Sequence, residues 1–173
     1  MGNAWITKVV LDTNCFIDAT NPTSRAHEAL QIILKASNSG KITLFVSLHS
    51  LHELEQKPDD AFALAKALPL LPHFPIGTWG EQVGTWSQAA GTWEDAKRNE
   101  EIQNDLKKLS KSGADIRDRG AYIDALCVQA DVFVTSDNDL VGKGPSSRIA
   151  EKYELTIMTP VKLAFELSSR SRQ

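Results

Sequence analysis

Short apolar runs rich in β-branched residues recur along the chain and predict the strands of a sheet. The runs are residues 6–11 (ITKVVL), 42–46 (ITLFV), 131–135 (DVFVT) and 155–158. The first run is apolar on both faces at its end, which is typical of a strand in a parallel sheet covered on both sides. The pattern therefore predicts four parallel strands.

Stretches with apolar residues at helical spacing follow these runs. Asn38-Ser39-Gly40 ends the first stretch, and Thr159-Pro160 supplies an N-cap and a first-turn proline for the last. The predicted helices cover residues 24–37, a stretch from near Ser47 to before Pro58, residues 118–130 and residues 161–168. This alternation predicts a single α/β domain over residues 1–173, folded as a three-layer α/β/α sandwich around a parallel sheet of four or five strands.

Residues 59–113 interrupt the alternation, because they contain no strand candidate. The triplet GTW recurs every seven residues and places Trp79, Trp86 and Trp93 near one stripe of a helix. Packing of this stripe onto the domain or a partner is the favoured interpretation, and a stacking platform for bases is the alternative.

A new helix is expected to begin at Thr92 and to end at Ser112-Gly113. Thr92 is followed by two acids, Glu94 and Asp95, as is common at the start of a helix. Ile102, Leu106 and Leu109 then recur at helical spacing and are expected to face inward.

Composition narrows the class of protein. The chain has 173 residues, 42% of them hydrophobic, and a formal net charge of −3, so contact with a nucleic acid must depend on local basic patches. Cys15 and Cys127 form no CxxC pair and are expected to be buried thiols. The chain has no run of 18 apolar residues and no signal-peptide pattern, so a cytoplasmic protein without a membrane segment is expected.

Acidic side chains follow the predicted strands. Asp12 stands at the end of the first strand, Asp137 and Asp139 follow the third, and Glu53 lies on the helix after the second. In a parallel sheet the carboxyl ends of the strands meet at one edge, where ligands bind.

A further acid is expected from the predicted helix at 118–130. Asp118 shares a face with Ala121 and Ala125 and is aimed at the sheet, whereas Asp124 is about 9 Å further along the axis and turned off that face. Asp118 is therefore the better candidate. Carboxylates that converge at one edge repel each other unless a cation lies between them, and Mg²⁺ or Mn²⁺ prefers such oxygen ligands.

Four blocks of the sequence together resemble the signature blocks of the PIN-domain nucleases, a family that includes the VapC-type toxins. The blocks are VVLDTNCFID, SLHSLHEL, RDRGAYIDAL and DVFVTSDNDL, and LTIMTPVKL resembles the last strand and helix of the family. The resemblance spans residues 8 to 165, with residues 59–113 as a long variable helical part. One departure is Asp124, which stands where the family has an apolar or small residue.

The resemblance implies a Mg²⁺- or Mn²⁺-dependent ribonuclease that leaves a 5′-phosphate. The family's four acids fall on Asp12, Glu53, Asp118 and Asp137, and Asp139 matches a frequent additional acid that binds metal. Asn14 and Thr135 are expected to orient these ligands. The family also implies an RNA substrate, a homodimer with the closing helix or the Trp-bearing segment in the contact, and a cognate antitoxin protein as a partner.

Contacts with RNA are less well defined by the sequence. Arg117 and Arg119 flank Asp118 and could contact phosphates, although surface ion pairs are as good an explanation. Six other basic residues could follow an RNA backbone, but a solvated helix face is favoured for them: Lys97, Arg98, Lys107, Lys108, Lys111 and Lys143. The alternative function is a PIN-like module that binds RNA or a protein without cleaving RNA.

Overall fold

The computed structural model describes residues 8–57, 59–71, 93–111, 120–142 and 144–170, with the backbone alone at 93–96 and 109–111. These residues form four strands and nine helices. None of the described helices combines the length and the apolar character that crossing a membrane requires.

Four parallel strands form the sheet, in the order β2-β1-β3-β4. They are β1 (Lys8–Leu11), β2 (Thr43–Phe45), β3 (Val132–Val134) and β4 (Thr156–Met158). The chain runs from β1 to β2 on one side and then crosses back to β3 on the other side of β1. The order therefore reverses between β1 and β3, and in open α/β sheets this is the point where a ligand crevice forms.

The two faces of the sheet carry separate hydrophobic cores, because side chains alternate along each strand. Val9 and Leu11 belong to one core, and Val10 belongs to the other with Phe133. All of these side chains are buried, which explains why the first strand is apolar on both faces.

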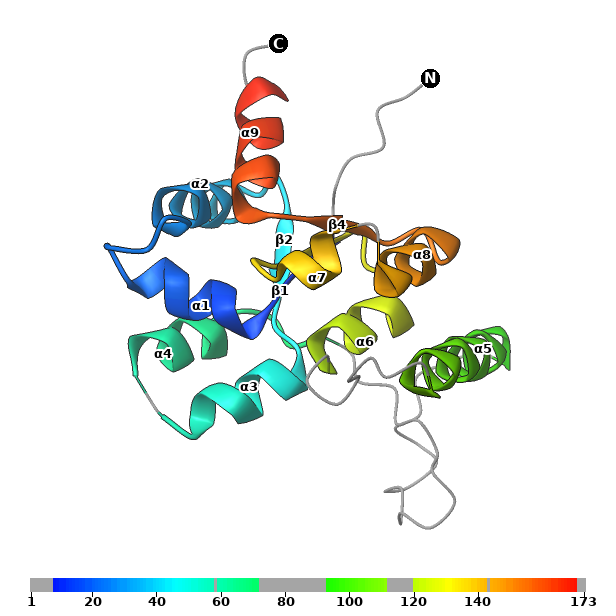
Figure 1. The fold of residues 1–173 in the computed structure, drawn as a ribbon. Coiled ribbons are helices and arrows are strands. Elements are labelled where there is room, and N and C mark those ends of the chain that lie inside the picture. The colour runs from blue at the N-terminus through cyan, green and yellow to red at the C-terminus, as the bar shows by residue number, and fades with distance from the viewer. Residues whose placement is uncertain (1–7, 58, 72–92, 112–119, 143, 171–173) are drawn as a thin grey trace.

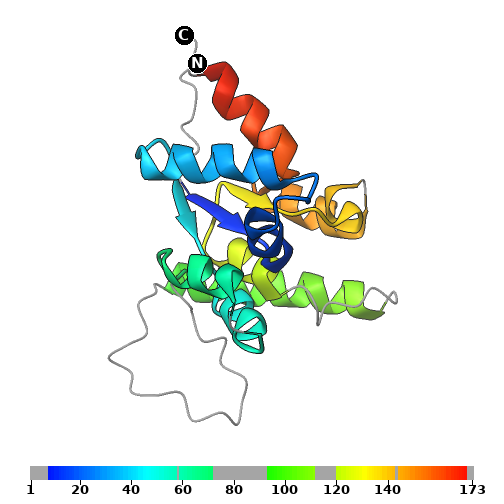
Figure 2. The ribbon, with the colours of Figure 1, turned by 90° about the vertical axis from the view of Figure 1, so that its left-hand side faces the viewer.

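Helices cover both faces (Figure 1). The core of Val9 includes residues of α1 (Thr13–Thr20), α2 (His27–Asn38), α3 (Leu48–Glu55), α4 (Asp60–Lys66) and α9 (Pro160–Arg170). The core of Val10 includes residues of α5 (Trp93–Lys111), α6 (Gly120–Cys127), α7 (Asn138–Val141) and α8 (Pro145–Lys152). In Figure 2 the sheet lies between α2 and α5.

The predicted α/β class and the sheet of four parallel strands are confirmed, and helices on both faces are compatible with the expected three layers. The predicted start of α3 and the predicted inward face of α5 are confirmed. The Ser47 side chain accepts a hydrogen bond from the Ser50 N–H at 3.0 Å as the N-cap of α3. Ile102 and Leu106 of α5 are buried as expected. The side chain of Leu109 and those of the Trp stripe lie outside the described residues.

Some features of the fold differ from the sequence prediction. Helices α1, α4, α7 and α8 were not individually expected. The segment after α4, for which no strand was expected, pairs with the outer edge of β2 through a bridge between Val46 and Leu70. The Val46 N–H donates to the Pro69 carbonyl at 3.0 Å, and the Leu71 N–H donates to the Val46 carbonyl at 2.8 Å. Cys15 is a buried free thiol as expected, whereas Cys127 is a free thiol that is only half-buried.

Candidate active site

A cleft of about 1000 Å³ opens beyond the carboxyl ends of β1 and β3, at the point where the strand order reverses. Four of the predicted acids line it: Asp12, Glu53, Asp137 and Asp139. Asn14 lines it as well. Asp118 lies outside the described residues, as do Arg117 and Arg119. The half-buried Asp124 is not among the residues that line the cleft.

Asp12 joins the end of β1 to the start of α1. Its N–H donates to the Val134 carbonyl at 2.9 Å and continues the pairing of β1 with β3. Its carboxylate accepts the Thr13 N–H at 2.8 Å on Oδ1 and the Thr135 hydroxyl at 2.7 Å on Oδ2. Burial raises the pKa of Asp12 more than these bonds lower it, and the nearby charges of Glu53 and Asp137 raise it further.

Asp137 is tied to Asp12 through a single side chain. The Thr135 hydroxyl donates to Asp12 and accepts the Asp137 N–H at 3.0 Å. Thr135 is wholly buried, so this hydroxyl has a fixed position. Asp137 then acts as the N-cap of α7 and accepts the Asp139 N–H on Oδ1 at 2.8 Å. The structure thus holds two of the predicted acids through the threonine expected to orient them.

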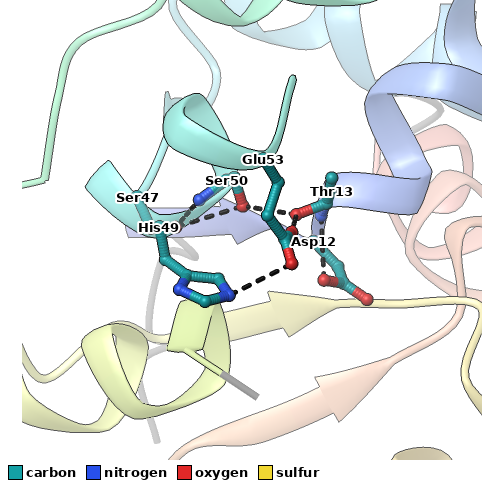
Figure 3. A network of polar contacts seen from close by, with 6 residues as sticks. All are labelled: Asp12, Thr13, Ser47, His49, Ser50 and Glu53. Atoms are coloured by element: carbon teal, nitrogen blue, oxygen red, sulfur yellow. Dashed lines mark hydrogen bonds and ion pairs between the residues drawn. The ribbon is translucent and has the colours of Figure 1, made fainter. Parts of the chain in front are cut away.

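Glu53 reaches the cleft from α3, and both of its oxygens have neighbours (Figure 3). Its Oε2 accepts the Thr13 hydroxyl in a short hydrogen bond, and its Oε1 lies 3.2 Å from His49 Nε2. The His49 ring in turn packs against Gly120 at the start of α6, where an added Cβ would lie 2.2 Å from a ring carbon. A side chain at position 120 would therefore displace the His49 ring from its place beside Glu53.

Three residues of this region were missed by the sequence analysis. His49 stands one helical turn before Glu53, and this i, i+4 spacing was a signal that could have identified it. Thr13 gave no signal beyond its place next to Asp12. Asp18 also lines the cleft and accepts the Ser24 hydroxyl at 2.8 Å on Oδ1. Its place on α1, six residues after Asp12, became informative only once that helix was known.

Arg98, one of the six basic residues considered for RNA contact, has a structural role. The Arg98 guanidinium donates to the Leu126 carbonyl at 2.8 Å and to the Tyr153 carbonyl at 3.2 Å. It therefore caps the carboxyl ends of α6 and α8, where a cation is favoured by the helix dipole. Lys97 and Lys107 are exposed, Lys108 pairs with Asp105 at 3.2 Å, and the side chains of Lys111 and Lys143 lie outside the described residues.

The oxygen atoms that line the cleft are of the chemical type that a hard divalent cation prefers. Among the described residues that line it, none is a lysine or arginine, so its carboxylates have no basic partner there. Carboxylate and amide oxygens are the ligands that Mg²⁺ and Mn²⁺ prefer. In the described part of the chain, however, no three or more His, Cys, Asp and Glu side chains form a group that could hold a metal ion.

Comparison with known proteins gave no relative. No protein-family model, no curated protein and no solved structure matches this chain. The functional argument therefore depends on the residues and the geometry of the cleft.

Proposed function

We propose that this protein is a PIN-like, divalent-metal-dependent ribonuclease that hydrolyses phosphodiester bonds of RNA in the cleft beyond β1 and β3. One observation carries the proposal. Carboxylates from three separate elements, namely Asp12 after β1, Glu53 on α3 and Asp137 after β3, line a single cleft at the reversal of the strand order. Solvated surface acids have no reason to converge in this way, because their charges repel each other.

Five acids are the residues that would hold Mg²⁺ or Mn²⁺: Asp12, Glu53, Asp118, Asp137 and Asp139. When bound, the ion would lower the pKa of a water molecule and neutralise charge that develops on the phosphate oxygens. Each oxygen of Asp12 accepts one hydrogen bond, from Thr13 or Thr135, and retains a further lone pair for a ligand.

Asn14 could contact the RNA directly. It is exposed in the cleft and its amide can donate a hydrogen bond to a phosphate oxygen. Water would attack the phosphorus in line with the leaving 3′ oxygen, and the product would carry a 5′-phosphate. Because the described lining has no cationic side chain, an RNA backbone would meet mainly negative charge unless a metal ion is bound.

A second candidate is a PIN-like module that binds RNA or a protein without cleavage. It would use the same cleft beyond β1 and β3 as a binding surface, with Asn14 and the carboxylates as hydrogen-bonding groups. The two functions differ in their requirement for a metal, because the binding module needs none.

Cleavage of an end-labelled single-stranded RNA in Mn²⁺ and in EDTA would test the proposal. We expect Mn²⁺-dependent cleavage by the wild-type chain and a loss of at least about 100-fold in Asp12→Asn, since removing even an indirect metal partner costs 10- to 100-fold. Asp59→Asn is the matched control, because Asp59 is also a helix N-cap but is exposed at α4, where asparagine caps equally well. Equal cleavage by Asp12→Asn and Asp59→Asn, or cleavage in EDTA, would contradict the proposal.

A further inference from the structure

Thr13 lies between two of the proposed metal ligands and contacts both. Its N–H donates to Asp12 Oδ1 at 2.8 Å, and its hydroxyl donates to Glu53 Oε2 (Figure 3). Asp12 and Glu53 come from different elements and are 41 positions apart in the numbering, so local backbone structure alone does not set their spacing. A single residue therefore connects their carboxylates.

A chain of hydroxyl groups continues from Thr13 into α3. The Thr13 and Ser50 hydroxyl oxygens are 3.0 Å apart, and those of Ser50 and Ser47 are 3.1 Å apart. An ionised carboxylate only accepts hydrogen bonds, so the one proton of the Thr13 hydroxyl must point to Glu53. Ser50 must then donate to Thr13, and Ser47 must donate to Ser50 while it accepts the Ser50 N–H. Every hydroxyl in the chain donates once and accepts once.

Burial makes this arrangement rigid. Ser47 and Ser50 are both wholly inaccessible to solvent, so water does not compete for their hydrogen bonds. Capping of α3 explains the bond between the Ser50 N–H and Ser47, but it does not explain why the Ser50 hydroxyl contacts α1. That second contact holds the Thr13 hydroxyl in the one orientation in which it reaches Glu53.

Thr135 provides a direct comparison on the other side of Asp12. Its hydroxyl donates to Asp12, and its oxygen accepts the Asp137 N–H. Two threonines thus connect Asp12 to the acid on each side of it. Only Thr135 was expected from the sequence to have such a role.

We propose that Thr13 is a positioning residue that sets the spacing of Asp12 and Glu53 for a divalent cation, and that Ser50 and Ser47 hold its hydroxyl in place. This inference rests on the proposed function, because it needs the two acids to act as metal ligands. It assigns to Thr13 no contact with the RNA or with the reacting phosphate.

Binding of Mn²⁺ alone, followed by the electron paramagnetic resonance signal of the free ion, tests the inference without an activity assay. Thr13→Val keeps the shape of the side chain and its N–H but lacks the hydroxyl, and we expect a 10- to 100-fold weaker affinity for Mn²⁺. Thr13→Ser restores the hydroxyl and should recover most of that affinity. Ser50→Ala should cause a smaller loss, because it removes only the group that orients Thr13.

Thr20→Val is the matched control on the same helix. The Thr20 hydroxyl bonds to the Phe16 and Ile17 carbonyls of its own helix, so its loss should leave the affinity for Mn²⁺ unchanged. Circular dichroism shows whether each variant folds. If Thr13→Val does not fold, the Mn²⁺ affinity of Ser50→Ala tests the inference, and an affinity equal to that of the wild type would contradict it.

The outcomes separate this inference from the proposed function. Wild-type affinity in Thr13→Val would overturn the inference and leave the metal site standing, and so would an equal loss in Thr20→Val. If the wild-type chain itself removes no Mn²⁺ from solution, the proposed function fails and the role of Thr13 falls with it.

Discussion

The Asp12 carboxylate is held where its charge is unfavourable. Burial and the neighbouring charges of Glu53 and Asp137 raise its pKa, although Thr13 and Thr135 both donate hydrogen bonds to it. A raised pKa in an acid means that the folded state binds the proton more tightly than the unfolded state does. In the metal-free protein, stability should therefore rise as the pH falls through the pKa of Asp12.

Asp12→Asn should stabilise the metal-free fold at pH 7. The neutral amide removes the buried charge, and the Thr135 hydroxyl can accept a hydrogen bond from it. We expect the melting temperature to rise on the order of 2–4 °C, the change that about 1 kcal/mol produces in a domain of this size. Urea unfolding in EDTA should show that this advantage shrinks as the pH is lowered, because the wild-type carboxyl then becomes neutral as well.

The exposed Asp59→Asn variant serves as the control for this effect and should show no comparable gain. A destabilised Asp12→Asn protein at pH 7 would mean that the hydrogen bonds to Asp12 outweigh the cost of its burial.

Single residues were predictable from the sequence where their role depends on near neighbours. Asp12 follows an apolar strand directly, Asp137 follows another within three residues, and Ser47 stands at a helix start where its side chain accepts the N–H three residues later. Thr13 differs, because its hydroxyl bonds to residues 37 and 40 positions away. No local pattern encodes the distance between α1 and α3, so such a contact becomes visible only in three dimensions.

Among the elements, α5 is held to the domain by polar groups as well as by its buried Ile102 and Leu106. Asp105 Oδ2 lies 2.5 Å from Lys152 Nζ and 2.9 Å from the Tyr153 hydroxyl, and Oδ1 lies 3.2 Å from Lys108 Nζ. Hydrogen bonds from Lys152 first, and then from Tyr153, lower the pKa of Asp105 to about 2. Arg98 adds the bonds to the carboxyl ends of α6 and α8.

The contact of α5 with α8 should weaken in acid. An acid with a lowered pKa contributes stability that is fully present above its unfolded pKa of 3.8, and this contribution is lost as the pH falls through its folded pKa of about 2. Asp105→Asn should therefore be less stable than wild type at pH 5, and the difference should close by about pH 2. Urea denaturation at a series of pH values measures it, and curves that stay parallel down to pH 2 would refute the role of Asp105.

A helix with a repeated apolar spacing was predictable, whereas the shortest helix and a one-residue strand pairing were not. Helix α5 was expected almost at its observed bounds, because Thr92 and Ser112-Gly113 mark its ends in the sequence and Ile102, Leu106 and Leu109 recur between them at helical spacing. Helix α7 has only four residues, and its one buried apolar side chain is Leu140, too few to show a helical period. The bridge from Leu70 to Val46 involves one residue on each side, and sequence patterns do not detect a pairing of that length.

For the whole molecule, the outer face of α9 carries an apolar pair that the described part of the chain leaves exposed. Phe165 is 74% exposed and Val161, one turn earlier, is 60% exposed. We propose that the protein is a homodimer with α9 in the contact. Light scattering at tens of micromolar should give the mass of two chains.

Phe165→Ser should shift this equilibrium towards the monomer. Loss of a central aromatic contact costs about 2 kcal/mol or more, which weakens association roughly 30-fold. Leu70→Ser is the control, since Leu70 is also an exposed apolar residue but lies beside β2. A wild-type chain that scatters as a monomer would refute the dimer, and an equal effect of both variants would refute the contact through α9.

The central place of β1 in the sheet has a consequence for the chain as it is synthesised. β1 is made first, but one of its two neighbours, β3, begins only at Val132, and the hydroxyl that holds Asp12 belongs to Thr135, 123 residues later. A nascent chain on the ribosome therefore presents Asp12 without β3, Thr135 or Asp137 until these later residues have been translated. The cleft beyond β1 and β3 can form only after the chain as far as Asp137 has left the ribosome, so its assembly comes late in the folding of the N-terminal strand.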